Sequence, residues 1–202
     1  MSEDLTPEAD PSCSGAEQDM LWMERVKNGD QEAFQLLIET HQSRIVGTVA
    51  KMLGDDTDSE DIAQQVFIRV WNSAARYQPT AKFTTWLFKI TRNLVFNELR
   101  RRKRHPASPL EHKEEDRSFQ MPDPNSPSPA ATMMDGELQA AIQRAIDSLP
   151  EAQRMAIILR RYEELSYEEI AEVLKLSVPA VKSILFRARA DLRERLQKYL
   201  DE

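Results

Sequence analysis

The stretch 165–189, with the sequence LSYEEIAEVLKLSVPAVKSILFRAR, limits the fold most, because it specifies two short helices joined by a tight turn. Ser166 and Glu169 have the spacing of a capping box, in which each side chain satisfies a free backbone N–H at a helix start. Ser177 is suited to cap a second helix only a few residues after the first one ends. Two amphipathic helices this close together must cross steeply.

The second of these helices is predicted to have two different faces. Apolar side chains recur along it at the spacing of one buried stripe: Val181, Leu185, Ala188, Leu192 and Leu196. The other face carries small, aromatic and cationic side chains: Ser177, Pro179, Ala180, Ser183, Phe186 and Arg187, with Lys182 and Arg193 at its margin. Such a face can enter a major groove and hold phosphates at its edges. The pattern indicates a DNA-binding helix-turn-helix, and the alternative is an ordinary helical hairpin with a solvated basic face.

The rest of the chain favours an all-α protein, because it has only five glycines and no alternating strand pattern of useful length. We expect two small helical domains joined by a flexible linker. Residues 1–19 form an acidic tail without aromatic side chains and are expected to be disordered. A first domain covers 20–105, a linker with six of the eleven prolines covers 106–136, and a second domain with the helix-turn-helix covers 137–202.

Charge and motifs narrow the class of function. The tail and the linker are more negative than the whole chain, whose net charge is -7, so the folded parts are close to neutral and should bind duplex DNA only weakly without a partner. Cys13 is the only cysteine, and the chain lacks a Gly-rich phosphate loop and a nucleophile elbow. We therefore expect no enzyme, no metal site and no cofactor. Without a membrane span or a secretory signal pattern, the expected location is the cytoplasm.

One predicted helix of the first domain, over 59–74, has an outward side of mixed character: Asp61, Gln64, Gln65, Ile68 and Asn72. An isoleucine among amides and a carboxylate is a sign of a protein contact surface. Single exposed apolar side chains also occur without any function, so the pattern alone leaves both interpretations open.

The segment 83–104 places a second polar strip on a helix. Lys89, Asn93, Asn97 and Arg100 lie together beside Trp86 and end in a run of five cations that includes Arg101. Cations contact phosphates, amides bond to base edges and aromatic rings stack on unpaired bases, so the strip suits single-stranded or opened DNA. The alternative is a solvated helix end whose basic residues favour the helix dipole.

Three motifs occur in a fixed order around the linker: DSEDIAQQVFIRVW, FTTWLFKITRNLVFNELRRRKR and SLPEAQRMAIILRRYEELSYEEIAEVLKLSVPAVKSILFRARADL. In these motifs the chain resembles the extracytoplasmic-function (ECF, group 4) sigma factors of bacterial RNA polymerase, which belong to the sigma-70 family. The resemblance covers 20–105 and 137–200. It implies a transcription initiation factor with a region 2-like domain and a region 4-like domain.

The resemblance also implies roles for the surfaces. The side from Asp61 to Asn72 would dock on the clamp coiled coil of the largest polymerase subunit. The strip with Trp86, Lys89, Asn93, Asn97, Arg100 and Arg101 would recognise the -10 element, and the face from Ser177 to Arg193 would read the -35 element. The implied partners are core RNA polymerase, promoter DNA and, as a candidate, an anti-sigma factor.

Two departures from the family pattern concern the second helix of the helix-turn-helix. Pro179-Ala180 stands where family members often have Gly-Thr, and Ile184 stands where they often have a basic residue. Ala180 and Ile184 would replace hydrogen bonds with apolar contacts, which leaves the -35 sequence preference open. Apart from the resemblance, two other functions fit: a free-standing helix-turn-helix regulator that binds a palindrome as a dimer, and a helical protein-interaction adaptor.

Overall fold

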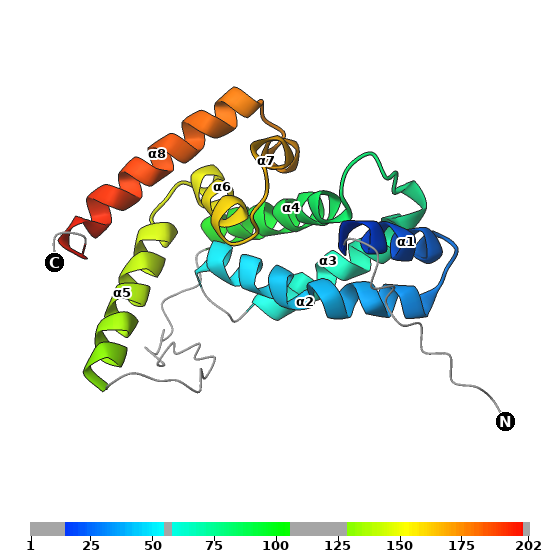
Figure 1. The fold of residues 1–202 in the computed structure, drawn as a ribbon, viewed down its shortest axis with the longest axis horizontal. Helices are drawn as coiled ribbons and strands as arrows, with labels where there is room; N and C mark the ends of the chain where they lie inside the picture. The colour runs from blue at the N-terminus through cyan, green and yellow to red at the C-terminus, as the bar shows by residue number, and fades with distance from the viewer. Residues whose placement is uncertain (1–14, 55–57, 106–128, 200–202) are drawn as a thin grey trace.

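The computed structural model describes residues 15–54, 58–105 and 129–199, and within these ranges all regular secondary structure is helical. The all-α prediction is confirmed (Figure 1). The elements are α1 Gly15–Lys27, α2 Gln31–Leu53, α3 Ser59–Ser73, η1 Ala74–Arg76, α4 Phe83–Arg104, α5 Pro129–Asp147, α6 Glu151–Arg161, α7 Tyr167–Leu174, α8 Val178–Leu196 and η2 Gln197–Tyr199. None of the helices in these ranges has the length and apolar character needed to cross a membrane.

In the first half, α1 to α4, the helices predicted over 59–74 and 83–104 correspond to α3 and α4. Asp30 caps α2, with its carboxylate accepting a hydrogen bond from the Ala33 N–H at 3.0 Å. Gly54 ends α2 in the left-handed region at φ 74°, where glycine is favoured. His41 is buried, and its Nε2 lies 2.9 Å from the Asp19 carboxylate.

Two predicted boundaries were wrong. Helix α1 begins at Gly15, so 15–19 belong to the fold and not to the tail. The acidic composition misled the prediction because Asp19 is buried against His41 and is not solvated. Helix α5 begins at Pro129, inside the predicted linker, because proline is tolerated in the first turn of a helix. The rest of the predicted tail and linker, 1–14 and 106–128, lies outside the described residues.

The second half, α5 to α8, contains the predicted helix-turn-helix. Both hydrogen bonds of the capping box are present, from the Ser166 N–H to Glu169 at 2.7 Å and from the Glu169 N–H to Ser166 at 3.1 Å. Lys175 turns the chain at φ 57°, and the Ser177 hydroxyl then accepts from the Ala180 N–H at the start of α8. On α8 the predicted stripe faces inward: Val181, Leu185 and Ala188 are buried, and Leu192 and Leu196 are half-buried.

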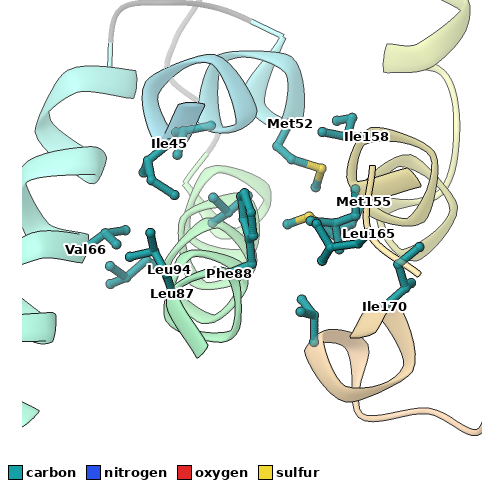
Figure 2. Packing of buried hydrophobic residues seen from close by; sticks show 14 of the residues in the cluster. Ile45, Met52, Val66, Leu87, Phe88, Leu94, Met155, Ile158, Leu165 and Ile170 are labelled. Carbon is teal, nitrogen blue, oxygen red and sulfur yellow. The ribbon is translucent and has the colours of Figure 1, made fainter. Parts of the chain in front are cut away.

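The two halves share one hydrophobic core, a contact that the sequence pattern did not predict. Helices α6 and α7 lie against α2 and α4 (Figure 1). Met52 and Phe88 of the first half face Met155 and Leu165 of the second (Figure 2), and all four are at most 4% exposed. The close packing brings the polar side of α4 next to α7, which determines the environment of the surfaces described below.

Candidate nucleic-acid and protein interfaces

Helix α4 carries the polar strip on one of its sides. We call Trp86, Lys89, Asn93, Asn97, Arg100 and Arg101 the α4 strip. Asn93, Asn97 and Arg100 are exposed and recur at the i, i+4, i+7 spacing of one helix face. Lys89 is half-buried, because its ammonium group pairs with the Glu172 carboxylate of α7 at 2.8 Å. The strip therefore has an open end toward Arg100 and a covered end at Lys89.

Trp86 is held in place by an aromatic cluster at the start of α4. Its ring centroid lies 5.1 Å from that of Tyr77 and 6.0 Å from that of Phe83. Tyr77 is buried, and its hydroxyl has no hydrogen-bond partner within the described residues. Burial and, less strongly, the nearby Asp19 and Glu24 carboxylates raise the pKa of Tyr77, so its phenol stays neutral. The half-buried Trp86 ring thus rests on a rigid apolar support that is suited to stacking with a base.

The cationic end of α4 is partly paired with acids. Glu98 accepts two hydrogen bonds from Arg101, at 2.7 and 2.8 Å, and one from Arg102 at 2.9 Å. The hydrogen bond from Arg101, with support from Arg102, holds the pKa of Glu98 below its ordinary value. Exposed ion pairs such as Arg101–Glu98 contribute little to stability, so a phosphate can replace the carboxylate at small cost.

The outward side of α8 presents the second predicted surface. We call Ser177, Pro179, Ala180, Lys182, Ser183, Phe186, Arg187 and Arg193 the α8 face. These residues are exposed except for Ala180, which is half-buried, and Phe186 stands out with 74% of its surface exposed. Among the described residues Lys182, Arg187 and Arg193 form no ion pair, so their charges are available to phosphates. Ile184 is half-buried and packs against the core, so it does not belong to this face.

Helix α3 presents the third predicted surface, and it borders a groove. Asp61, Gln64, Gln65, Ile68 and Asn72, which we call the α3 surface, are all exposed, and Ile68 is 58% exposed. The groove beside it measures about 640 Å³ and lies between α2 and α3, with these side chains along its walls: Gln31, Phe34, Ile38, Gln42, Glu60, Ala63, Gln64, Phe67, Ile68 and Trp71.

The segments that carry the three surfaces match the models of one protein family. The chain matches Sigma-70 region 2 over 37–105 and Sigma-70, region 4 over 139–192. It is 36% identical over 192 residues to the RNA polymerase sigma-H factor of Pseudomonas aeruginosa, covering 92% of this chain and 97% of the relative. It is 34% identical over 181 residues to the ECF RNA polymerase sigma-E factor of Escherichia coli K12, covering 89% and 94%. The chain belongs to the ECF sigma factors of the sigma-70 family.

The fold of this sigma factor is also similar to that of a solved relative. The structure of CnrH in complex with the cytosolic domain of CnrY matches with a TM-score of 0.65 and 26% identity, and it covers 90% of this chain and 98% of CnrH. The family match favours a sigma factor over a free-standing regulator or a helical adaptor. The region 2 match contains the α3 surface and the α4 strip, and the region 4 match contains the α8 face except for Arg193, which lies one residue beyond it.

The sigma factor structure brings together the residues within each predicted surface and keeps the surfaces apart. The α3 surface and the α4 strip lie on different helices of region 2, and α6 and α7 separate α4 from α8 (Figure 1).

No group of three or more His, Cys, Asp and Glu side chains in the described ranges could hold a metal ion.

Sequence reasoning missed two sets of residues beside these surfaces. Phe34 and Ile38 of α2 are half-buried and form a wall of the groove, where the Phe34 ring lies 5.0 Å from Trp71. Lys82 and Arg92 flank the α4 strip and are bound by region 4, through Glu169 and the Leu174 carbonyl. The only signal of the groove in the sequence is that Phe34 and Ile38 lie to one side of the buried apolar face of α2.

Proposed function

We propose that this sigma factor uses the α4 strip to recognise an opened -10 element and the α8 face to read the -35 element. The observation that carries the proposal is the composition of the α4 strip: two exposed amides, Asn93 and Asn97, stand in line with Arg100 and beside the supported ring of Trp86. Amides reach base edges, a cation reaches phosphates and a fixed ring stacks on an unpaired base. This set of contacts suits a melted strand better than a closed duplex.

The energetics favour capture of a base that has left the stack. Removing a base from the duplex costs a few kcal/mol. Stacking on an aromatic side chain returns about 1–3 kcal/mol per base, and the Asn93 and Asn97 amides add hydrogen bonds. The two contributions are of the same size, so the α4 strip would stabilise an opening that the polymerase begins.

The α8 face is suited to the major groove of the -35 element. Pro179 lies in the first turn of α8, and Ser183 and Arg187 follow one and two turns later on the exposed side. Hydroxyl and guanidinium groups at this spacing reach base edges and phosphates, and Phe186 can contact a thymine methyl group. Ile184 packs inward, so the apolar contacts of this face would come from Ala180 and Phe186.

The α3 surface is proposed to bind core RNA polymerase, through the clamp coiled coil of its largest subunit. Ile68 has an apolar groove on one side and the exposed Gln64, Gln65 and Asn72 around it. A central apolar anchor within a polar rim is the usual composition of a protein interface. Polymerase binding would also compensate for the weak DNA affinity expected of a chain with a net charge of -7.

The proposed sigma factor acts in the cytoplasm and performs no catalysis of its own. Its partners are core RNA polymerase and promoter DNA, and an anti-sigma factor is a further candidate partner. Transcription from a promoter library with core polymerase tests the central proposal. We expect specific transcripts only when the protein is present. Output identical to that of core polymerase alone would contradict it, and tight binding of a palindrome without polymerase would favour a free-standing regulator.

A further inference from the structure

Two buried ionisable side chains of this sigma factor belong to none of the three surfaces. Asp19 on α1 is 4% exposed and His41 on α2 is 3% exposed, and the Asp19 carboxylate lies 2.9 Å from the His41 Nε2. Burying such groups is unfavourable unless they are hydrogen-bonded, and apolar side chains of similar volume often stabilise a core as well or better. The pair is therefore better explained by a role in orientation than by a gain in stability.

The His41 ring links this pair to the aromatic cluster at the start of α4. Helix α1 lies against α2, η1 and α4 (Figure 1). The His41 ring centroid is 5.3 Å from that of Phe83, the first residue of α4, and the Phe83 ring is 6.0 Å from that of Trp86. Phe83 is fully buried, so a change in the orientation of the His41 ring is transmitted to Phe83 by direct packing. One imidazole thus contacts both Asp19 and a ring that supports Trp86.

Asp19 also lies near the second ring of the cluster, Tyr77. Burial and, less strongly, the Asp19 carboxylate raise the pKa of Tyr77, so α1 carries this acid close to the phenol. The Tyr77 hydroxyl has no hydrogen-bond partner within the described residues, and Phe83 has no polar group. Neither ring is oriented by a hydrogen bond of its own. The Asp19–His41 hydrogen bond supplies a directional contact next to both of them.

We propose, on the basis of the proposed function, that Asp19 and His41 are positioning residues for recognition of the -10 element. Their hydrogen bond fixes the His41 ring, which fixes Phe83 and, through it, the orientation of the Trp86 ring. Both residues are buried, so neither contacts DNA. A ring that is oriented before an unpaired base arrives loses little freedom when the base stacks on it.

Loss of this hydrogen bond should affect promoter opening and not polymerase binding. Without it, Phe83 and Trp86 occupy several orientations, and only a fraction of the chains present Trp86 to the base. The apparent affinity for the opened strand falls in proportion to that fraction, about tenfold when a tenth of the chains are competent. The α3 surface lies on a different helix, so core polymerase should bind as before.

Three variants of the full-length protein separate orientation from stability. Asp19→Leu removes the hydrogen bond and leaves the His41 ring buried without this partner. Asp19→Leu combined with His41→Phe removes both polar groups, so neither is left unpaired, and the fold should be at least as stable as in Asp19→Leu. Asp19→Asn is the conservative variant, because an amide can accept from the His41 ring or donate to it.

Leu53→Ala is the control for a general loss of core packing. Leu53 is 8% exposed and lies at the C-terminal end of α2, roughly 18 Å along the helix axis from His41. Its truncation should lower stability without moving the aromatic cluster. Chemical denaturation measures the stability of each variant, and the other measurements are made under conditions in which every variant is folded.

Two measurements on these proteins decide the outcome. The NMR signal of the Trp86 indole N–H in the free protein, assigned by its absence from Trp86→Phe, depends on the orientation of the neighbouring rings. It should move in Asp19→Leu and in the double variant, and stay in place in Asp19→Asn and Leu53→Ala. With core polymerase, permanganate footprinting should show about tenfold less promoter opening for the two variants whose signal moves. Fluorescence anisotropy should show unchanged polymerase affinity for all four.

Two results would overturn the proposal. One is a double variant that opens promoters like the wild type, whether or not its Trp86 signal moves. The other is an equal loss of opening in Leu53→Ala, because stability and not orientation would then be the cause.

Transcription by the wild type and by Trp86→Ala separates this proposal from the proposed function. If the wild type with core polymerase gives no promoter-specific transcripts, the proposed function fails, whatever the Trp86 signal shows. If the wild type is specific and Trp86→Ala reduces opening, but Asp19→Leu and the double variant do not, only the positioning proposal fails.

Discussion

In this sigma factor, the role of a single side chain depends more on the residues around it than on its amino-acid type. Trp86 and Phe186 are both aromatic side chains on proposed DNA surfaces. Trp86 is half-buried on Tyr77 and Phe83 and so has one fixed orientation, whereas Phe186 is 74% exposed. A fixed ring loses little entropy when a base stacks on it, so Trp86 is suited to hold an unpaired base. Phe186 is better suited to an apolar contact in a groove.

Asn93 is the residue of the α4 strip whose truncation should report most directly on base recognition. Its side-chain oxygen accepts from Arg92 at 2.8 Å, so its amide hydrogens point to donate elsewhere. Asn93→Ala should reduce promoter opening about tenfold, in line with the 1–3 kcal/mol of a good base contact, and leave core polymerase affinity unchanged. Permanganate footprinting and a polymerase binding assay measure the two effects. Gln35→Ala, at an exposed amide outside the three surfaces, is the control, and equal opening by both variants would contradict the assignment.

Ile68 should act as the anchor of the polymerase interface. Ile68→Asp places a charge where we expect a desolvated apolar contact, so core polymerase affinity should fall by at least about 2 kcal/mol, or roughly thirtyfold. Fluorescence anisotropy with core polymerase measures the loss. Leu21→Asp is the matched control, because Leu21 on α1 is 55% exposed and Ile68 is 58% exposed. Similar losses for both variants would mean that a general charge effect, and not the α3 surface, is responsible.

At the scale of elements, local capping determines the helix-turn-helix. The Ser166–Glu169 box starts α7, and Ser177 starts α8. Ser166→Ala removes one half of the box and should lower the free energy of unfolding by about 1 kcal/mol. Chemical denaturation measures the change. Ser43→Ala, at an exposed position inside α2, should have almost no effect, and equal effects of the two changes would show that the cap contributes nothing.

The capping glutamate should also make α7 sensitive to acid. Burial pushes the pKa of Glu169 up, but hydrogen bonds from the Ser166 backbone and from Lys82 outweigh it and keep the pKa below the ordinary value of 4.5. A lowered pKa in the folded state gives stability that is present above about pH 4.5 and is lost as the pH falls further. Glu169→Gln should therefore lose less stability than the wild type between about pH 6 and pH 3.5. Chemical denaturation of both proteins at the two pH values measures these losses. Equal losses of unfolding free energy in the wild type and Glu169→Gln would contradict this account.

Sequence patterns predicted the elements whose local signals agree with their environment. The caps at Ser166 and Ser177 are local hydrogen bonds, and the structure places both as expected. The start of α1 could not be predicted, because Asp19 is buried only through a partner 22 positions away, His41. A local sequence pattern does not predict a contact that depends on a distant part of the chain.

Helix α4 also makes contacts whose partner a local sequence pattern does not predict. Leu87 and Leu94 are buried on one side of the helix and lie beside Val66 of α3 (Figure 2). Phe88 on another side is equally buried, against region 4. A helix with apolar residues on two sides is packed between two layers, and the pattern of 83–104 contains that signal. The sequence does not show which element forms the second layer, because the chain between 105 and 129 separates the partners.

At the scale of the whole molecule, the shared core should make each half depend on the other. Leu94 is 7% exposed and packs within region 2, so in two independent domains its truncation would not affect region 4. Leu94→Ala should destabilise region 2 by about 2–5 kcal/mol. Unfolding of region 2 removes Met52 and Phe88 from the apolar side of α6 and α7, so α8 should lose protection from hydrogen exchange as well. Exchange at the Val181, Leu185 and Ala188 amides, measured by NMR in the free protein, should therefore become faster. Unchanged exchange at these three amides, with faster exchange in α3, would show that the regions are stable separately and that the contact between them contributes little.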